Sequence, residues 1–298
     1  MRYTVPAAVS LGDCLARLLA GASGRTRKQL LAGDRVRVNG TVVRRGDSAL
    51  VAGDVVEVGP RGPRAVLPPG LIHVYEDDDV IVVDKPAGLL TIATERERER
   101  TAYTHLMAHA RARRPPGRVF VVHRLDRLVS GLLVFATSPA AKRTLQAQFA
   151  AHTVERAYLA VVEGRPARAE GTITSRLLDD VPGRVRETRR PGRGRLAVTR
   201  WRVRRAGERH ALLEIRLETG RRNQIRVHLA NAGHPIAGDA AYGCRTDPWG
   251  RLALHAHVLG FDHPRTGARL RFVSPAPSAF AKLPTRRGIL HRRADCAP

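Results

Sequence analysis

The stretch VFVVHRLDRLVSGLLVFA, residues Val119–Ala136, joins two apolar runs through a charged segment. The runs Val119–Val122 and Gly131–Ala136 are short and continuous, a pattern typical of strands that are buried on both faces. The segment between them carries His123, Arg124, Asp126 and Arg127. The fold is therefore expected to mount one carboxylate on a loop between two core strands.

Asp126 has two interpretations at this point. A carboxylate on a loop between buried strands is fixed in place and open to a ligand, and the arginines beside it favour its ionised form, as an anionic nucleophile requires. The alternative is an aspartate that caps a turn or pairs with Arg127 on the surface. Spacing alone favours the second interpretation.

The composition predicts a globular protein with one large and one small domain, because the chain has 298 residues and is 43% hydrophobic. No apolar run approaches the ~20 residues that a membrane helix needs. Asp13 and Arg17 interrupt the only N-terminal segment that could resemble a signal peptide, so a cytoplasmic protein is expected. Three distant cysteines suggest neither a disulfide framework nor a metal site.

The net charge of +25 indicates a polyanionic partner. Only four of the 52 basic residues are lysines, and the planar fork of arginine suits phosphate contacts and stacking on bases. A nucleic acid is therefore the expected partner in preference to a membrane surface. Aromatic residues make up only 4% of the chain, which argues against a platform of stacked aromatic side chains.

Residues 1–60 are expected to form a small α+β domain, with helices at Leu11–Ala20 and Arg25–Leu31. Asn39-Gly40 stands between alternating apolar residues, which predicts a β-hairpin. The run SGRTRKQLLAGDRVRVNGTVV with VAGDVVEV resembles the S4-like RNA-binding domain. The resemblance implies five phosphate-contacting residues, Arg25, Arg27, Lys28, Arg35 and Arg37. A basic face that only contacts solvent is the alternative.

A linker rich in proline and glycine is expected at residues 59–72, before a large domain at residues 73–285 and a basic tail at residues 286–298. Helices are predicted at Thr101–Arg113, Pro139–Ala151 and Gln224–Ala232. Strands are predicted at Val80–Val83, Tyr158–Val162, Val198–Val203, Ala211–Leu217, Ala253–Phe261 and Arg269–Phe272, and residues 182–195 are expected to form a mobile loop or hairpin tip.

Five blocks in the large domain resemble the RluA family of RNA pseudouridine synthases: DKPAGLLT, HRLDRLVSGLLVFA, ERAYLAVVEG, TGRRNQIRVHLANAGHPIAGDAAYG and LHAHVLGFDHPRTG. The resemblance spans residues 72–283. It implies an α+β fold with a mixed, mostly antiparallel central sheet, and it implies isomerisation of uridine in RNA without metal or cofactor. It also makes the nucleophile the favoured interpretation of Asp126.

The same resemblance assigns roles to further residues. Arg226 matches the arginine that pairs with the catalytic aspartate, and Tyr158 matches the tyrosine that lies against the target base. Ile225 matches the aliphatic residue beneath the base, and Arg124 matches the arginine linked to base extrusion. His123 is placed in the substrate site and is interpreted as a structural, hydrogen-bonded histidine.

Four residues depart from the family pattern. Val129 replaces the usual threonine of HRLDxxTSG, Arg222 and Asn223 replace the threonine and histidine of TGRTHQIR, and Arg156 replaces the frequent lysine before the tyrosine. Large-subunit ribosomal RNA is the favoured substrate over transfer RNA, and a monomer that needs no protein partner is expected. The main alternative is a non-catalytic RNA-binding or ribosome-assembly factor. The sister family of small-subunit pseudouridine synthases is a narrower one.

Overall fold

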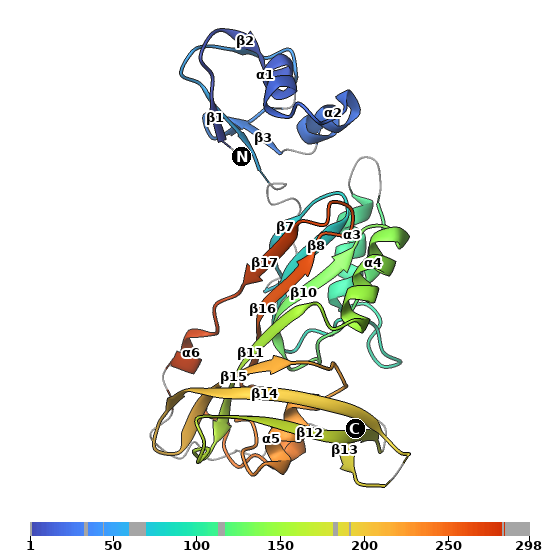
Figure 1. Cartoon of the computed structure of the whole chain (residues 1–298), viewed down its shortest axis with the longest axis vertical. Helices are drawn as coiled ribbons and strands as arrows, with labels where there is room; N and C mark the ends of the chain where they lie inside the picture. The colour runs from blue at the N-terminus through green and yellow to red at the C-terminus, as the bar shows by residue number, and fades with distance from the viewer. Residues whose placement is uncertain are drawn as a thin grey trace. The chain divides into compact units, whose positions relative to one another are not determined.

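The computed structural model describes residues 2–32, 35–43, 45–59, 70–112, 117–180, 184–190, 192–281 and 283 (Figure 1). The chain divides into two compact units, Met1–Val66 with Tyr75–Asp78 and Leu67–Val74 with Asp79–Pro298. Most of the predicted linker and the whole basic tail at 286–298 lie outside the described residues. No helix in the described ranges is long and apolar enough to cross a membrane.

The smaller unit contains two helices and two small sheets. The helices are α1 (Leu11–Leu18) and α2 (Gly24–Ala32). The larger of the two sheets has the order β1-β6-β3-β4, with β1 (Arg2–Thr4), β6 (Val55–Val58), β3 (Val36–Val38) and β4 (Thr41–Val42), and β2 (Val9–Ser10) pairs with β5 (Ala49–Leu50). Both expected helices are present, and the leucines of α1 and α2 pack with Val36 and Val56 in one core.

The expected hairpin at Asn39-Gly40 joins β3 to β4. Both residues have positive φ, 51° and 80°, which is the geometry that favours this dipeptide in a two-residue turn. The Asn39 side chain donates to Asp54 at 2.8 Å and accepts from the Val55 amide at 2.9 Å. The turn is therefore fixed by the backbone preference of this dipeptide and by hydrogen bonds to the start of β6.

The larger unit is built on an 11-stranded sheet, as counted over the described residues. Its order is β13-β12-β14-β15-β11-β16-β10-β8-β7, with β17 beside β16 and β9 beside β10. The strands are β7 (Ile72–Glu76), β8 (Val80–Lys85), β9 (Phe120–Val121), β10 (Ser130–Ala136), β11 (Glu155–Glu163), β12 (Glu170–Asp179), β13 (Val185–Thr188), β14 (Arg195–Ala206), β15 (His210–Leu217), β16 (Leu254–Asp262) and β17 (Arg269–Val273). The β10–β16 pair is parallel and the other registered pairs are antiparallel. The expected mixed, mostly antiparallel sheet is confirmed.

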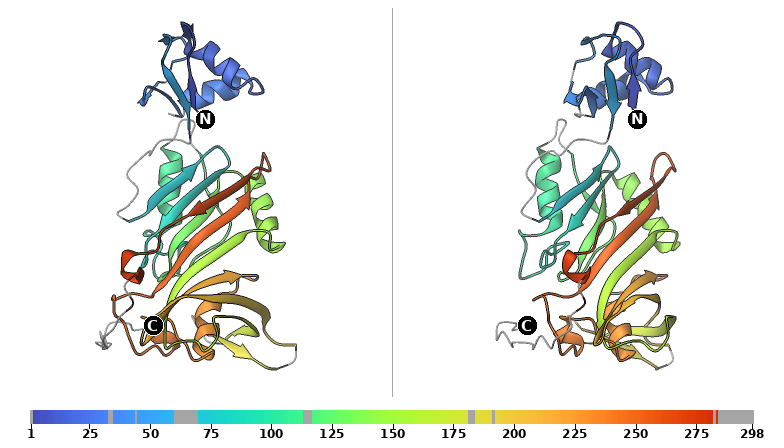
Figure 2. Two further views of the ribbon diagram at one scale, coloured as in Figure 1. Left: turned by 60° about the vertical axis from the view of Figure 1, so that its left-hand side comes forward. Right: turned by 90° about the vertical axis from the view of Figure 1, so that its left-hand side faces the viewer.

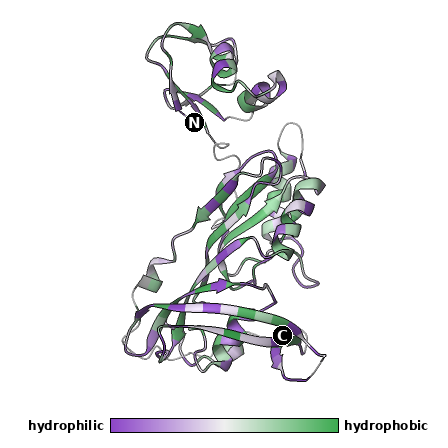
Figure 3. Cartoon of the chain, in the orientation of Figure 1, coloured by the Kyte–Doolittle hydropathy of each residue, from purple (hydrophilic) through white to green (hydrophobic). Residues whose placement is uncertain are grey.

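Five helical segments accompany the sheet: α3 (Ala102–Arg111), α4 (Pro139–Ala150), α5 (Gln224–Asn231), the 3-10 turn η1 (Ala240–Tyr242) and α6 (Ser278–Ala281). Helices α3 and α4 lie on opposite sides of β8 and β10 (Figure 2). Alternate β10 residues Leu133 and Phe135 pack with α3, and α4 contacts β10 and β16. All seven β10 residues are buried as a result, and Figure 3 shows this strand as largely hydrophobic.

The structure differs from the sequence-based expectation at two places. Val119–Val122 contributes only the two-residue β9, whose side chains are half-buried, although Val119 and Val122 themselves are buried. The charged run at 182–195 contains β13, which pairs with β12 in a hairpin. Strand β12 was not predicted, because every second residue of EGTITSRLLD faces solvent and few are large and apolar.

Gly131 permits the parallel contact between β10 and β16. It has φ +115°, and a Cβ at this position would lie 2.3 Å from the Ala256 carbonyl oxygen and 2.5 Å from the Ala256 amide nitrogen. A backbone that approaches this closely excludes any side chain. The strand that follows Asp126 therefore depends on glycine at its second position.

Gly131→Ala should lower the free energy of unfolding by about 3 kcal/mol, because the methyl group adds a backbone clash to the strain of positive φ. Gly267→Ala is the matched control, since Gly267 has φ +70° and a Cβ added there would have no heavy atom within 4 Å. The control should lose only about 1 kcal/mol. Urea unfolding of both variants measures the difference, and equal losses would contradict the role given to Gly131.

Candidate active site

Asp126 lies on the loop that joins β9 to β10. The Thr91 hydroxyl donates to the Leu125 carbonyl at 2.8 Å and accepts from the Leu125 amide at 3.1 Å. The Val129 amide donates to the Asp126 carbonyl at 3.1 Å. Leu125 and Val129 are buried in the core. Packing and hydrogen bonds therefore hold the backbone on both sides of the carboxylate.

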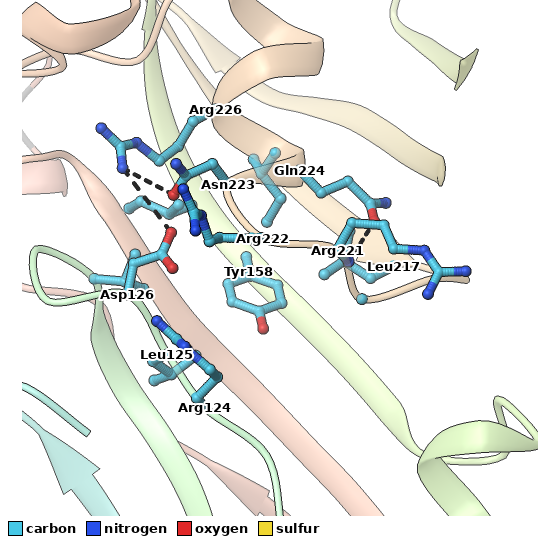
Figure 4. A pocket seen from close by; sticks show the side chains of 14 residues that line it. Arg124, Leu125, Asp126, Tyr158, Leu217, Arg221, Arg222, Asn223, Gln224 and Arg226 are labelled. Carbon is cyan, nitrogen blue, oxygen red and sulfur yellow. Dashed lines mark hydrogen bonds and ion pairs between the residues drawn. The ribbon is translucent and has the colours of Figure 1, made fainter. Parts of the chain in front are cut away.

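Asp126 faces a cavity of about 160 Å³ (Figure 4). The Asp126 loop forms one wall and residues 220–226, which lead into α5, form another. Tyr158 from β11, Leu217 from β15 and Leu254 from β16 complete the lining. Among the described residues that line the cavity, Asp126 is the only carboxylate. Four guanidinium groups come from Arg124, Arg221, Arg222 and Arg226.

Arg226 connects Asp126 to a second carboxylate. Its Nη1 lies 4.0 Å from Oδ2 of Asp126, while Nε and Nη2 each donate to Asp239 at 2.7 Å. Nη1 also donates to Oδ1 of Asn223 at 3.1 Å, and the guanidinium carbon lies 4.8 Å from the centroid of the Tyr242 ring. Asp239 is 1% exposed, and a two-point pair of this kind fixes the plane of a guanidinium. Asp239 therefore orients Arg226 toward Asp126.

The charge of Asp126 is set by two opposing effects. Burial raises the pKa of Asp126, because a carboxylate with little water around it is less stable than the neutral acid. The positive charges of Arg226, Arg124, Arg222 and Lys85 lower it again, with Arg226 the strongest. For Arg226, burial works against the charge, but the hydrogen bonds and the charge of Asp239 outweigh it and raise its pKa.

Lys85 is a buried cation at the end of β8. Its ammonium donates to the carbonyls of Pro86 at 2.9 Å, Leu89 at 2.8 Å and Arg127 at 3.3 Å. Burial lowers the pKa of Lys85 to about 7, and Asp126 is the strongest of the groups that oppose this. Three acceptors match the three protons of an ammonium group, so this lysine ties the backbone after Asp126 to β8 and adds positive charge near the carboxylate.

Tyr158 and Ile225 give the cavity its apolar surfaces. Tyr158 is 9% exposed and Ile225 is 5% exposed, and both belong to the main core as well as to the lining. Burial raises the pKa of Tyr158, so its phenol stays protonated. The two residues therefore offer a flat ring and an aliphatic side chain within the same small space.

Arg124 and His123, although adjacent in the chain, have different surroundings. Arg124 is exposed and lines the cavity. His123 is not among the lining residues. It stacks on Phe149 with ring centroids 4.5 Å apart and its Nε2 accepts from the Val134 amide at 3.2 Å. Burial, assisted by Arg156, lowers the pKa of His123 to about 3, so the ring is neutral, as an acceptor must be.

The five basic residues predicted to contact phosphate all lie in the smaller unit. Arg25 and Lys28 are exposed on α2. Each of the other three donates a side-chain hydrogen bond to a backbone carbonyl: Arg27 to that of Ala22, Arg35 to that of Gly59 and Arg37 to that of Gly40. Arg27 and Lys28 also line a cavity of about 340 Å³ between α1 and α2.

Asn223 compensates for the histidine that the family pattern would place there. It has φ 52° just before α5, a conformation that asparagine tolerates better than most residues. Its side chain accepts from Arg226 and donates to the Tyr242 hydroxyl at 3.0 Å. The Gln224 side chain accepts from the Arg221 amide at 2.9 Å. The segment that carries Arg226 is therefore well anchored.

Sequence reasoning missed Asp239 and Tyr242 as parts of the site. Both stand in the block GHPIAGDAAYG, which contributed to the resemblance without any role for these two residues. Asp239 is 13 positions from Arg226, and no helix or strand period links the two. The only available signal was an acidic residue within a run of small and apolar residues in a basic chain.

The arrangement suits attack on a flat, uncharged ring by a carboxylate. Asp126 is the one group in the described lining that can act as an anionic nucleophile, since Tyr158 is kept neutral. The ring of Tyr158 and the side chain of Ile225 provide surfaces against which a base can pack. The guanidinium groups around the cavity suit the phosphates of a nucleic acid.

Comparison with known proteins identifies the chemistry. The family model described as RNA pseudouridylate synthase matches residues 79–231. The uncharacterized RNA pseudouridine synthase YlyB of Bacillus subtilis strain 168 is 39% identical over 272 residues, covering 87% of this chain and 88% of that protein. Ribosomal large subunit pseudouridine synthase D of Vibrio cholerae is 33% identical over 298 residues, covering 92% and 89%.

A solved structure agrees with these matches. Human RNA pseudouridylate synthase domain containing 1 superposes with a TM-score of 0.57 and 28% identity, covering 72% of this chain and 86% of that one. The enzyme class expected from the sequence is thereby confirmed over the non-catalytic alternative. Because the family match includes both the Asp126 loop and α5, and the relatives align over most of their length, this chain belongs to the RNA pseudouridine synthases, isomerases that act on uridine in RNA.

Proposed function

We propose that Asp126 is the catalytic nucleophile, that Arg226 holds its carboxylate, and that Tyr158 supports the target uracil. The observation that carries this proposal is the guanidinium of Arg226, fixed by Asp239 at 2.7 Å and lying 4.0 Å from Asp126. An ionised carboxylate beside an oriented cation is pre-organised for attack, because it needs little rearrangement when the substrate arrives.

The reaction requires uracil to leave C1′, turn, and rejoin the sugar through C5. The bond between C1′ and N1 breaks, a bond between C1′ and C5 forms, the proton on C5 is released to solvent, and N1 takes up a proton, so that the product is an isomer of uridine. Asp126 can serve by attack on C1′, by attack on C6 of the base, or by removal of a sugar proton. All three routes need the ionised carboxylate next to the glycosidic bond.

The other predicted residues receive supporting roles. Ile225 packs beneath the base, and Arg124, exposed at the rim, fills the space that an extruded uridine leaves in its stem. His123 supports the catalytic loop from behind through Phe149 and the Val134 amide. Its neutral, buried ring suits a structural role and does not suit proton transfer near neutral pH.

Large-subunit ribosomal RNA is the substrate that we propose. Relatives named ribosomal large subunit pseudouridine synthase D, from Vibrio cholerae and Pseudomonas aeruginosa, are 33% and 36% identical to this chain. The net charge of +25 supports a large, structured polyanion as the partner. An enzyme with this substrate would act in the cytoplasm.

We further propose that residues 1–60 form an S4-like RNA-binding domain. The two helices and the hairpin expected for such a domain are present, and Arg25 and Lys28 are exposed on α2. These two residues are the strongest candidates for phosphate contacts. Arg27, Arg35 and Arg37 would contact phosphate with the nitrogen atoms that their backbone hydrogen bonds leave available.

Asp126→Asn should reduce tritium release from 5-tritiated uridine in RNA by at least about a thousandfold, because an amide cannot replace the nucleophile. The substrate is ribosomal RNA from a strain that lacks the gene. Asp262→Asn, at an exposed pair with Arg269, is the matched control and should keep its activity. Label release by the Asp126→Asn protein at the rate of the original chain would sink the proposal.

The rate of tritium release should fall on acidification at a pH above the ordinary aspartate pKa of about 3.9. Burial raises the pKa of Asp126 and only the ionised form attacks, so activity rises with pH through this pKa. The same raised pKa means that stability is greater while the group is protonated and declines as pH rises through the pKa. Asp126→Asn should therefore be at least as stable as the original chain at pH 7. A rate that stays flat down to pH 4, with folding checked by circular dichroism, would contradict this.

Asp239→Asn should lower kcat by roughly tenfold to a hundredfold with a much smaller change in KM, because Arg226 loses the partner that orients it. The loss of a buried charge partner will also lower Tm, so kinetics are measured well below the transition. Circular dichroism at the assay temperature gives the folded fraction, and kcat per folded molecule then separates a loss of positioning from a loss of folded enzyme. An unchanged kcat would show that Arg226 needs no second carboxylate.

A further inference from the structure

A second cavity, of about 470 Å³, adjoins the catalytic cavity in the larger unit. The two share one wall, made of Gly220, Arg221 and Arg222. The second cavity extends over the end of β12, the start of β13 and the start of β14. A ligand that leaves the catalytic cavity over this wall therefore enters the second cavity directly.

The floor of the second cavity is apolar and firmly packed. Leu177 and Val185 are each 4% exposed and belong to a small core with Ala197 and Val227 of α5. Tyr242 packs against the same core, and its hydroxyl accepts from the Val185 amide at 3.1 Å. Because Tyr242 also lies against Arg226, the floor is connected to the residue that holds Asp126.

The rim of the second cavity is positively charged. Arg195 and Arg222 are exposed, and Arg221 is anchored by donation to the Leu196 carbonyl at 3.1 Å. Arg222 forms an ion pair with Asp179 at 3.4 Å, in which the two side chains are 36% and 71% exposed. Exposed pairs of this kind contribute little, so a phosphate can displace Asp179 from Arg222 at low cost.

Arg222 faces both cavities. It lines each of them, and it is one of the cations that lower the pKa of Asp126. Figure 4 shows Arg222 beside Asp126 and Tyr158, while the neighbouring Arg221 side chain extends away from Asp126. The shared wall thus presents guanidinium groups in both directions, as a backbone phosphate that bridges two adjacent nucleotides would require.

We propose that the second cavity binds the nucleotide next to the target uridine in the RNA strand. Its base packs on the floor formed by Leu177 and Val185, and the linking phosphate contacts Arg222 and Arg195. This inference rests on the proposed function, because it takes the catalytic cavity as the site of the target uridine. The inference adds that the enzyme binds two neighbouring nucleotides, both unstacked, while it isomerises one of them.

A merely basic surface is the alternative, and it makes a different prediction. Phosphate contacts alone are indifferent to which bases are present. A cavity that receives a base should prefer RNA in which two bases are adjacent. The distinction can be tested with short single strands, without knowledge of the natural target.

The test measures binding of the full chain carrying Asp126→Asn, which cannot turn over RNA, to two labelled RNA pentamers. One has uracils at positions 3 and 4 and abasic residues elsewhere, and the other has uracils at positions 1 and 5. Both carry the same phosphates and the same number of bases. The adjacent pair should bind about tenfold more tightly, because one molecule fills both cavities. Equal affinities would overturn the proposal.

A pair of arginine variants on one strand tests the rim. Arg195→Gln should weaken binding of the adjacent-uracil pentamer about fivefold and reduce the slope of log affinity against log salt by about 1. Arg202→Gln is the matched control, since Arg202 lies on the same strand, is exposed, and pairs with Glu170 outside both cavities. Equal effects of the two variants would also overturn the proposal.

The outcome is separate from that of the catalytic proposal. The pentamer assay reports binding, whereas tritium release by the original chain reports isomerisation. A preference for adjacent uracils without tritium release would support the second cavity and reject the proposed catalysis. Tritium release without a preference for adjacent uracils would support the proposed catalysis and reject the second cavity as a nucleotide site.

Discussion

The site depends on the guanidinium of Arg226, because this one group interacts with two carboxylates, those of Asp239 and Asp126. Asp239 is buried and takes both short hydrogen bonds, so it determines where the guanidinium lies. Asp126 is 22% exposed at its side chain and receives the same cation at 4.0 Å. A pair this loose leaves the Asp126 oxygens free to react while still favouring their negative charge.

Burial creates the need for this arrangement. The small cavity proposed to enclose the base buries Asp126, and this burial raises the pKa of Asp126 and so disfavours its ionised form. Arg226, Arg124, Arg222 and Lys85 counteract this from several directions. Burial also disfavours the charged form of Lys85 and lowers its pKa to about 7, and the negative charge of Asp126 opposes this fall. The nearby cations thus favour the ionised form of Asp126, and Asp126 in turn favours the protonated form of Lys85.

Local signals in the sequence predicted most of the elements and long-range contacts explain what was missed. Asn39-Gly40 has positive φ and a tight hairpin, since that preference is intrinsic to the dipeptide. Gln224–Asn231 forms the expected helix, with Gly233 at φ +82° just beyond its end. Strand β12 escaped notice because it presents alternating small and polar residues, and Asp239 because its pairing with Arg226 arises only from folding. The resemblance supplied the candidate residues, whereas the orienting carboxylate came from the geometry.

Two of the departures from the family pattern, Val129 and Asn223, have physical substitutes in this chain. Val129 lacks a hydroxyl, but its side chain is 3% exposed and packs in the main core, so apolar packing holds the loop where a hydrogen bond could have done so. Asn223 keeps a polar side chain at a position with φ 52° and links Arg226 to Tyr242. Tyr242 in turn joins the apolar core under the second cavity. Asn223 therefore lies between Arg226 and the surface proposed for the neighbouring nucleotide, where a change in shape would alter both.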